Sequence, residues 1–67
     1  MRAKIKTALE YKYKGEIAEA TANVEVYLSN PAGIGAHPDI VGAIDTQMDR
    51  IAEAEDKLMA LEKHFHW

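Results

Sequence analysis

The sequence predicts an all-α protein, an antiparallel two-helix hairpin that assembles into a homo-oligomeric helical bundle. Both prolines and two of the four glycines of this 67-residue chain fall within residues 30–38. On either side of that segment, apolar residues recur at intervals of three or four positions, which is the period of an α-helix. We therefore expect a single domain over residues 1–67, with helices over about 3–29 and 38–65 and a loop over 30–37.

The first predicted helix carries two rows of apolar residues. The main row consists of Ile5, Leu9, Tyr13, Ile17, Ala20, Val24, Tyr27 and Leu28. A second row, which we expect beside the first, consists of Tyr11, Ala18, Ala22 and Val26. Together the two rows would form an apolar face that is wider than one partner helix needs.

Residues at the two ends of the loop mark where the helices stop and start. Asn30 can adopt the left-handed conformation that often ends a helix, and Pro31 cannot continue one. Pro38 suits the first turn of the second helix, where Asp39 is favourable beside the positive end of the helix dipole. The apolar spacing then repeats at Val41, Ile44, Met48, Ile51, Ala54, Leu58, Leu61 and Phe65. The opposite face, expected in water, carries Asp45, Asp49, Glu53, Asp56 and Glu62.

A hairpin of two helices leaves apolar surface to be covered. Its helices share one contact surface, and no third layer of secondary structure covers the remaining apolar positions. Small residues, namely Ala8, Ala18, Ala20 and Ala22, allow neighbouring helices to approach closely. We expect a homo-oligomer, a dimer or a tetramer, built as a four-helix bundle or a pair of such bundles.

Composition argues against several classes of function. The chain has no cysteine, which excludes disulfides, thiolate metal sites and cysteine nucleophiles. Its net charge of -3 argues against binding of long nucleic acids. No apolar stretch is long enough for a membrane span, and the first residues do not resemble a secretory signal, so we expect a cytoplasmic protein. With a single serine, Ser29, and no Glu-x-x-His motif, the sequence predicts neither an enzyme nor a cofactor.

Charge is distributed unevenly along the chain. Residues 1–14 contain five basic residues and one acidic residue, whereas residues 15–67 contain three basic and ten acidic residues. This asymmetry indicates an anionic partner for the first half of the first helix. The alternative is that the basic turns pair with the acidic second helix of the same or a neighbouring chain.

Within the basic region, the segment Tyr11-Lys12-Tyr13-Lys14 combines two aromatic rings with two amines. An aromatic ring can stack on a base while an amine meets a phosphate, so the segment suits a nucleotide. The two tyrosines point about 200° apart on a helix, and only one of them can face a given ligand. Tyr13 follows the main apolar row, so Tyr11 is the candidate for a ligand or interface face. The alternative for Tyr11 is simple helix packing.

The loop contains Gly33-Ile34-Gly35 immediately before the second helix, followed by His37. Glycines expose backbone N–H groups, and the start of a helix favours anions, so this segment can hold a phosphate with His37 as a further donor. Asp39 argues against an anion, because it places negative charge in the same turn. The alternative is a tight interhelical turn in which the glycines supply unusual backbone angles and Ile34 covers the end of the bundle.

Two segments of the chain carry a resemblance to known proteins. They are Thr7-Ala8-Leu9-Glu10-Tyr11-Lys12-Tyr13-Lys14-Gly15-Glu16 and the combination of Val26-Tyr27-Leu28, Asn30-Pro31, Gly33-Ile34-Gly35 and His37-Pro38-Asp39. Over roughly residues 7–65 the chain resembles very short proteins of tailed bacteriophages, many of them marine. Such small helical phage proteins are similar to anti-CBASS sponges, which oligomerise and sequester the cyclic oligonucleotide signals of bacterial immune enzymes.

The resemblance implies a non-enzymatic protein of the host-cell cytoplasm that binds cyclic dinucleotides or trinucleotides. Across a subunit interface, we expect Tyr11 to stack on a base and Lys12 or Lys14 to offset phosphate charge. The neighbouring subunit would supply Gly33, Ile34, Gly35 and His37. The competing hypothesis is a small phage structural or interaction protein that binds a host or virion protein through its helical faces. A third class, an enzyme acting on nucleotides, has no suitable set of residues.

Overall fold

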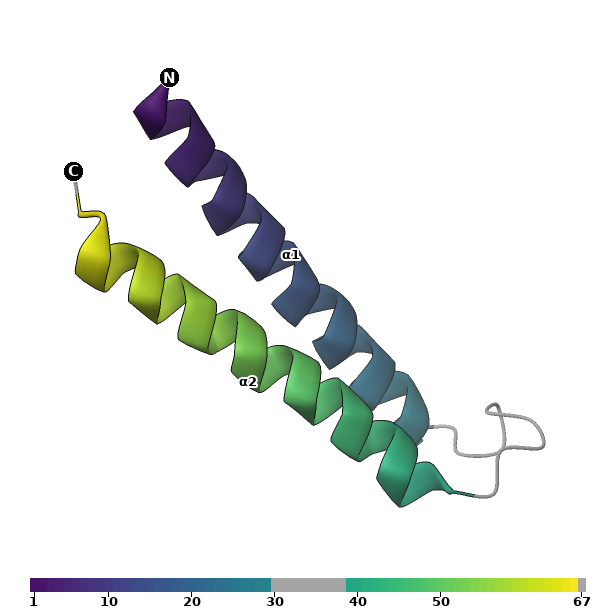
Figure 1. Ribbon diagram of the computed structural model, residues 1–67. Helices are drawn as coiled ribbons and strands as arrows, with labels where there is room; N and C mark the ends of the chain where they lie inside the picture. Colours follow the sequence, from purple (N-terminus) through teal and green to yellow (C-terminus); the bar gives the residue numbers. More distant parts are fainter. Residues whose placement is uncertain (30–38, 67) are drawn as a thin grey trace.

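The computed structural model describes residues 1–29 and 39–66, and these residues form two α-helices (Figure 1). Helix α1 covers Arg2–Ser29 and helix α2 covers Ile40–His64, with no strand in the described part of the chain. The molecule measures 46 × 16 × 15 Å, so it is little wider than two packed helices. This confirms the all-helical class and the two predicted helices, and the homo-oligomeric bundle stays a prediction.

Helix α2 begins two residues later than the predicted start at residue 38. Asp39 is its N-cap, with non-helical backbone angles (φ -108°, ψ 78°), and its carboxylate accepts a 2.8 Å hydrogen bond from the backbone N–H of Gly42. That bond satisfies one of the donors that the first turn of a helix leaves free, which fixes the start of α2 after Asp39. At the other end α2 stops at His64, one residue early, and the Phe65 N–H donates to the carbonyl oxygen of Leu61.

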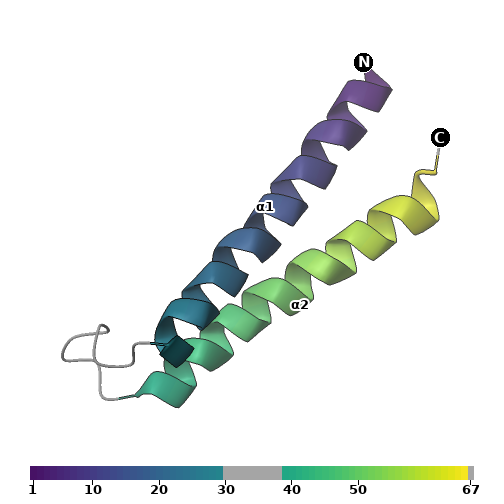
Figure 2. The same ribbon diagram turned by 180° about the vertical axis from the view of Figure 1, so that it is seen from behind.

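Contacts between side chains of the two helices fix an antiparallel register. Asn23 Nδ2 donates to Gln47 Oε1 at 3.0 Å, and Lys57 Nζ lies 5.6 Å from the centre of the Tyr13 ring. Between these two contacts the position on α1 falls by ten residues while the position on α2 rises by ten, as it does in antiparallel helices. Two opposite views show the helices side by side where α2 begins and diverging toward the N-terminal end of α1 and the C-terminal end of α2 (Figures 1 and 2).

The surface between α1 and α2, called the seam below, buries little side-chain volume. Ala20, Ala54 and Leu61 are the buried apolar residues of the described chain, and no large side chain there is fully buried. The half-buried members of the predicted main row are Leu9, Tyr13, Ile17, Val24 and Tyr27. Ile5 and Leu28 were predicted in the same row, but they are 54% and 67% exposed. The seam therefore covers only the central strip of that row.

The second apolar row of α1 lies on the far side of the helix from the seam, and the expectation of one continuous wide face was wrong. Each residue turns an α-helix by about 100°, so Ala18 in the second row points about 200° away from the buried Ala20. Tyr11, Ala18, Ala22 and Val26 are all exposed in the structure. Helix α1 thus has two separate apolar faces, and α2 covers one of them.

The outer face of α2 combines charged and apolar residues. The five acidic residues expected in water are exposed, as predicted: Asp45, Asp49, Glu53, Asp56 and Glu62. Val41 and Met48 were expected to face α1, but they are 80% and 49% exposed, because the seam follows a narrower strip of α2. Neither described helix is long and apolar enough to be a candidate membrane span.

Candidate functional site

The structure places Tyr11 and Tyr13 on different sides of α1. Tyr13 is half-buried in the seam beneath the Lys57 ammonium, whereas Tyr11 points outward and is 73% exposed. This agrees with the predicted placement of one tyrosine in the core and one on a free surface. Lys14 follows Tyr11 by three residues, which puts the exposed ring and the ammonium on one side of the helix.

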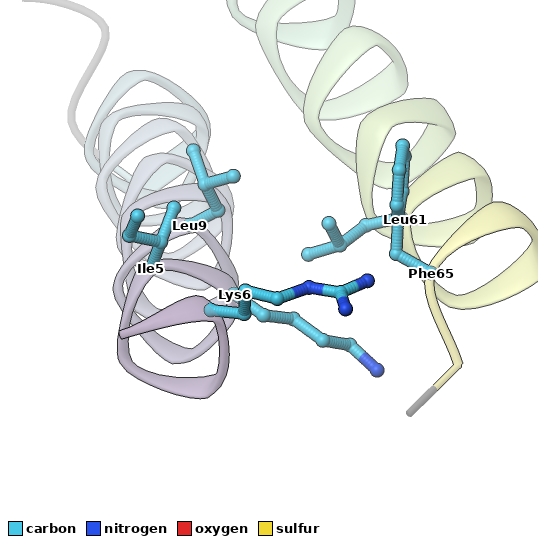
Figure 3. Close-up of a pocket in the computed structure, with 6 residues that line it drawn as sticks. Ile5, Lys6, Leu9, Leu61 and Phe65 are labelled. Atoms are coloured by element: carbon cyan, nitrogen blue, oxygen red, sulfur yellow. The ribbon is translucent and has the colours of Figure 1, made fainter.

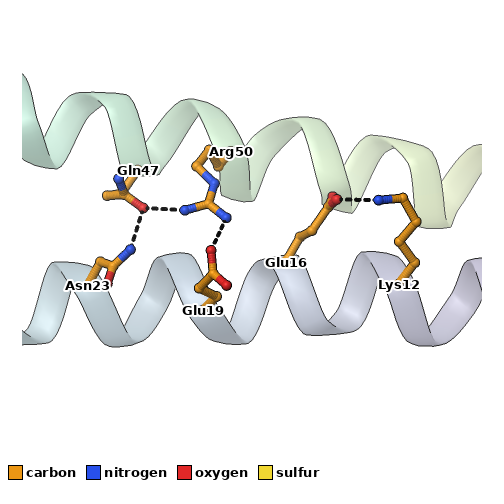
Figure 4. Close-up of polar contacts among 6 residues, drawn as sticks. All are labelled: Lys12, Glu16, Glu19, Asn23, Gln47 and Arg50. Atoms are coloured by element: carbon orange, nitrogen blue, oxygen red, sulfur yellow. Dashed lines mark hydrogen bonds and ion pairs between the residues drawn. The ribbon is translucent and has the colours of Figure 1, made fainter.

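Lys12, the third predicted ligand contact on α1, points to a different neighbour. Its Nζ donates to Glu16 Oε1 at 3.0 Å, and its side chain remains 62% exposed (Figure 4). The hydrogen bond from Lys12 holds the pKa of the Glu16 carboxyl below its ordinary value of 4.5. Because part of the Lys12 charge is already balanced within the chain, Lys14 is better placed to meet a phosphate.

A polar network on the seam joins α1 to α2 near the centre of the hairpin (Figure 4). Gln47 Oε1 accepts hydrogen bonds from Asn23 Nδ2 and from Arg50 Nη1, both at 3.0 Å. Arg50 also donates through Nη2 to Glu19 Oε1. Within the described residues, no buried side-chain nitrogen or oxygen lacks a partner. The network holds the register of the hairpin and leaves no polar group in need of a ligand.

Sequence reasoning missed a cavity where the helices diverge. Its volume is about 370 Å³, and it is lined by Arg2, Ile5, Lys6, Leu9, Leu61 and Phe65. Leu61 and Phe65 of α2 face Ile5, Lys6 and Leu9 of α1 across the opening (Figure 3). All four apolar residues were placed in the predicted rows, but the pattern of a single helix carries no information on how far apart two helices lie.

Lys6 shows that the basic end of α1 pairs with the acidic helix α2. Its Nζ lies 3.8 Å from Glu62 Oε2, and its side chain is only 12% exposed. Pairing within the chain therefore accounts for part of the charge asymmetry. Lys14 lies one turn beyond Glu10 and makes no ion pair with any residue in the described ranges. Its charge remains available to an anionic partner.

The structure describes only the part of the predicted ligand site that lies on α1. Gly33, Ile34, Gly35 and His37 lie outside the described residues. Tyr11 is 18 residues before the end of α1 at Ser29, which corresponds to about 27 Å along the helix axis. That a second subunit combines the loop with Tyr11, Lys12 or Lys14 stays a prediction. In the described part of the chain, no group of His, Asp and Glu side chains is arranged to hold a metal ion.

Comparison with known proteins gave no match to a family model, a curated protein or a solved structure. The function of this chain is therefore inferred from its own residues. The likeness to phage proteins rests on the two segments described in the sequence analysis and stays a prediction.

Proposed function

We propose that this protein binds and sequesters cyclic dinucleotides or trinucleotides, the second messengers of bacterial CBASS immunity, without reacting with them. In this proposal the protein is encoded by a bacteriophage and acts as a homo-oligomer in the cytoplasm of the host cell. The proposal follows the resemblance to anti-CBASS sponges, and the surface chemistry of α1 supports it.

The exposed pair formed by Tyr11 and Lys14 is the observation that carries the proposal. Tyr11 is 73% exposed and contributes no packing to the seam. A solvent-exposed tyrosine ring offers a flat surface for a base, and a lysine one turn away offers a charge for the adjoining phosphate. A cyclic dinucleotide presents two bases and two phosphates, so two copies of this pair in a symmetric oligomer match its chemistry.

Thermal melting with a panel of cyclic dinucleotides and trinucleotides tests the proposal. A ligand at 100 times its Kd stabilises the folded state by about 2.7 kcal/mol. For a chain of this size that raises the Tm by about 11–22 °C. We expect a rise with one or a few members of the panel. Chromatography of the ligand after incubation should recover it unchanged, whereas a loss over time would indicate an enzyme.

Matched variants locate the site. Lys14→Glu and Tyr11→Ala should each remove the rise in Tm, whereas Asp49→Lys, on the exposed acidic face of α2, should keep it. A rise that survives both changes on α1 would place the ligand elsewhere. No rise with any cyclic nucleotide would contradict the proposal.

A second candidate function is favoured by the exposed apolar residues of α2. Ala54 and Leu61 of this helix are buried, whereas Val41 is 80% exposed and Met59 is 70% exposed. Such positions suit a helical face that binds a host or virion protein. This function predicts a flat response to the nucleotide panel, together with a loss of protein binding in Val41→Glu and Met59→Glu variants that still fold.

A further inference from the structure

We propose that the outer face of α1 packs antiparallel against the same face of a second copy of this chain, with Lys12 of each copy opposite Glu19 of the other. The outer face is defined by five residues on the side of α1 away from the seam: Ala8, Tyr11, Gly15, Ala18 and Ala22. This inference rests on the self-association part of the proposed function and describes the ligand-free chain, in which Tyr11 packs against the second copy. A base that stacks on Tyr11 would compete with that contact.

The spacing of the outer face is that of a helix–helix interface. Its residues follow one another at intervals of three, four, three and four, which is the alternation of the contact positions in paired helices. Large apolar residues that α2 leaves uncovered lie at the edges of this face. Val26 is 54% exposed, and Leu28 is 67% exposed. In an isolated hairpin this second apolar face would stay exposed to water and would contribute nothing to packing.

The accessible area of the chain agrees with an uncovered interface. A compact 7.5 kDa monomer is expected to expose about 4,200 Å². The chain exposes 4997 Å², an excess of about 800 Å² over that value. A standard protein interface covers about 800 Å² on each partner, so a second copy is large enough to account for the excess.

Side-chain sizes favour an antiparallel arrangement. With Gly15 opposite Ala18 of the partner subunit, the bulky Tyr11 lies opposite Ala22 of the partner subunit. Two small residues then meet at the centre, where the helix axes can approach closely, and the large Tyr11 ring meets a small residue on either side. A parallel arrangement in register would instead set Tyr11 against its own copy and bring the two Glu25 carboxylates together, which like-charge repulsion disfavours.

The edges of the outer face are complementary in the same register. On one edge, Lys12 meets Glu19 of the partner subunit, and twofold symmetry repeats this pair. Within its own chain Glu19 accepts from Arg50, yet its side chain is 67% exposed and keeps a carboxylate oxygen for a second cation (Figure 4). Lys12 is 62% exposed and can shift between Glu16 and this partner.

The antiparallel arrangement also determines in which direction the Tyr11 side chain points along the partner's α1. Helical side chains lean toward the N-terminus of their own helix. In an antiparallel pair, the N-terminal direction of one α1 is the C-terminal direction of the other. Tyr11 therefore leans along the partner's α1 toward Ser29 of the partner subunit.

Charge reversal in mixed samples tests the pairing. Lys12→Glu and Glu19→Lys each create two like-charge pairs in the homodimer, and each should raise the dimer Kd, measured by sedimentation or native mass spectrometry, by about tenfold. In an equal mixture of the two variants, the heterodimer regains both opposite-charge pairs and its Kd should return to within about threefold of wild type. The Lys12→Glu chain still lacks its contact to Glu16 and the Glu19→Lys chain still lacks its contact to Arg50, so recovery reports the intermolecular pairs alone.

Asp49→Lys on the polar face of α2 is the matched control and should leave the dimer Kd unchanged. A wild-type chain that remains monomeric at high micromolar concentration would overturn the proposal, as would unchanged association of either single variant. A mixture that associates no better than its components would also refute the assigned pairs. Association and ligand binding are measured separately, so a dimer that ignores every cyclic nucleotide would contradict only the proposed function.

Single cysteines test the direction of the helices, because the chain has no cysteine of its own. In the proposed register, Ala8→Cys lies opposite Glu25→Cys of a second copy, and an oxidised mixture of the two variants should form a disulfide-linked heterodimer. Each variant alone should stay uncrosslinked, since its own copies are separated by 17 residues, or about 25 Å. Crosslinking of each variant alone would indicate parallel helices and overturn the register.

Discussion

The N-cap of α2 can be tested by comparing two glycines inside helices, Gly42 near the start of α2 and Gly15 in α1. Replacing glycine by alanine inside a helix stabilises it by about 1 kcal/mol. At Gly15 an added Cβ would meet nothing of its own chain within 4 Å, so Gly15→Ala should stabilise the monomer by that amount. At Gly42 the added Cβ would lie 2.2 Å from Asp39 Oδ2 and 2.7 Å from its Cγ. The capping carboxylate would have to leave, and loss of such a cap costs about 1 kcal/mol.

Gly42→Ala should therefore gain close to nothing, about 1 kcal/mol less than Gly15→Ala. That difference corresponds to about 4–8 °C in Tm for a chain of this size. Circular dichroism melts at several protein concentrations measure it and separate it from changes in assembly, which make the Tm depend on concentration.

A double-mutant cycle identifies the cause. Asp39→Ala alone should lose about 1 kcal/mol, and Gly42→Ala added to that variant should then gain about 1 kcal/mol, because no carboxylate remains to be displaced. Equal stabilisation by Gly15→Ala and Gly42→Ala in the otherwise wild-type chain would refute the reasoning.

Two further predictions concern the seam and the surface of α1. Ala54 is 1% exposed, so Ala54→Leu should destabilise the protein by about 1–3 kcal/mol in urea unfolding, while the same change at the exposed Ala52 should cost little. Lys12→Ala should raise the pKa of the Glu16 carboxyl toward 4.5 in an NMR titration. A carboxyl with a lowered pKa stabilises the fold above pH 4.5 and loses that contribution as the pH falls through its lowered pKa, so the variant should lose less stability on acidification. An unchanged pKa would mean that the contact does not persist in solution.

The sequence was sufficient for the helices and insufficient for their packing. Proline positions and apolar spacing predicted both elements to within two residues, because backbone sterics and helical periodicity are local properties. Asp39 was expected at the positive end of the dipole of the second helix. Its place as the N-cap, just before the first turn, depends on the hydrogen bond that its carboxylate accepts from the Gly42 N–H. The placement of Tyr11 away from Tyr13 followed from helix geometry alone.

The angle between α1 and α2 was not predictable from either helix. The cavity beside Leu61 and Phe65 exists because the helices diverge, and divergence depends on how both helices pack together. The same divergence leaves Ile5 largely exposed, although its spacing placed it in the main apolar row. The ligand hypothesis likewise needs residues from two subunits. A sequence identifies these residues but carries no information on how two subunits are placed relative to each other.

The divergence of the helices has a consequence for the order in which the hairpin opens. Asn23 and Gln47 are separated by 24 residues along the chain, whereas Lys6 and Glu62, which meet at the diverging end, enclose more than twice that length. Closing the longer segment costs more chain entropy, and fewer contacts oppose its release. Backbone amides near the chain ends should therefore exchange with solvent first. The two helices should separate progressively, starting at the pair Lys6–Glu62 and proceeding toward the pair Asn23–Gln47.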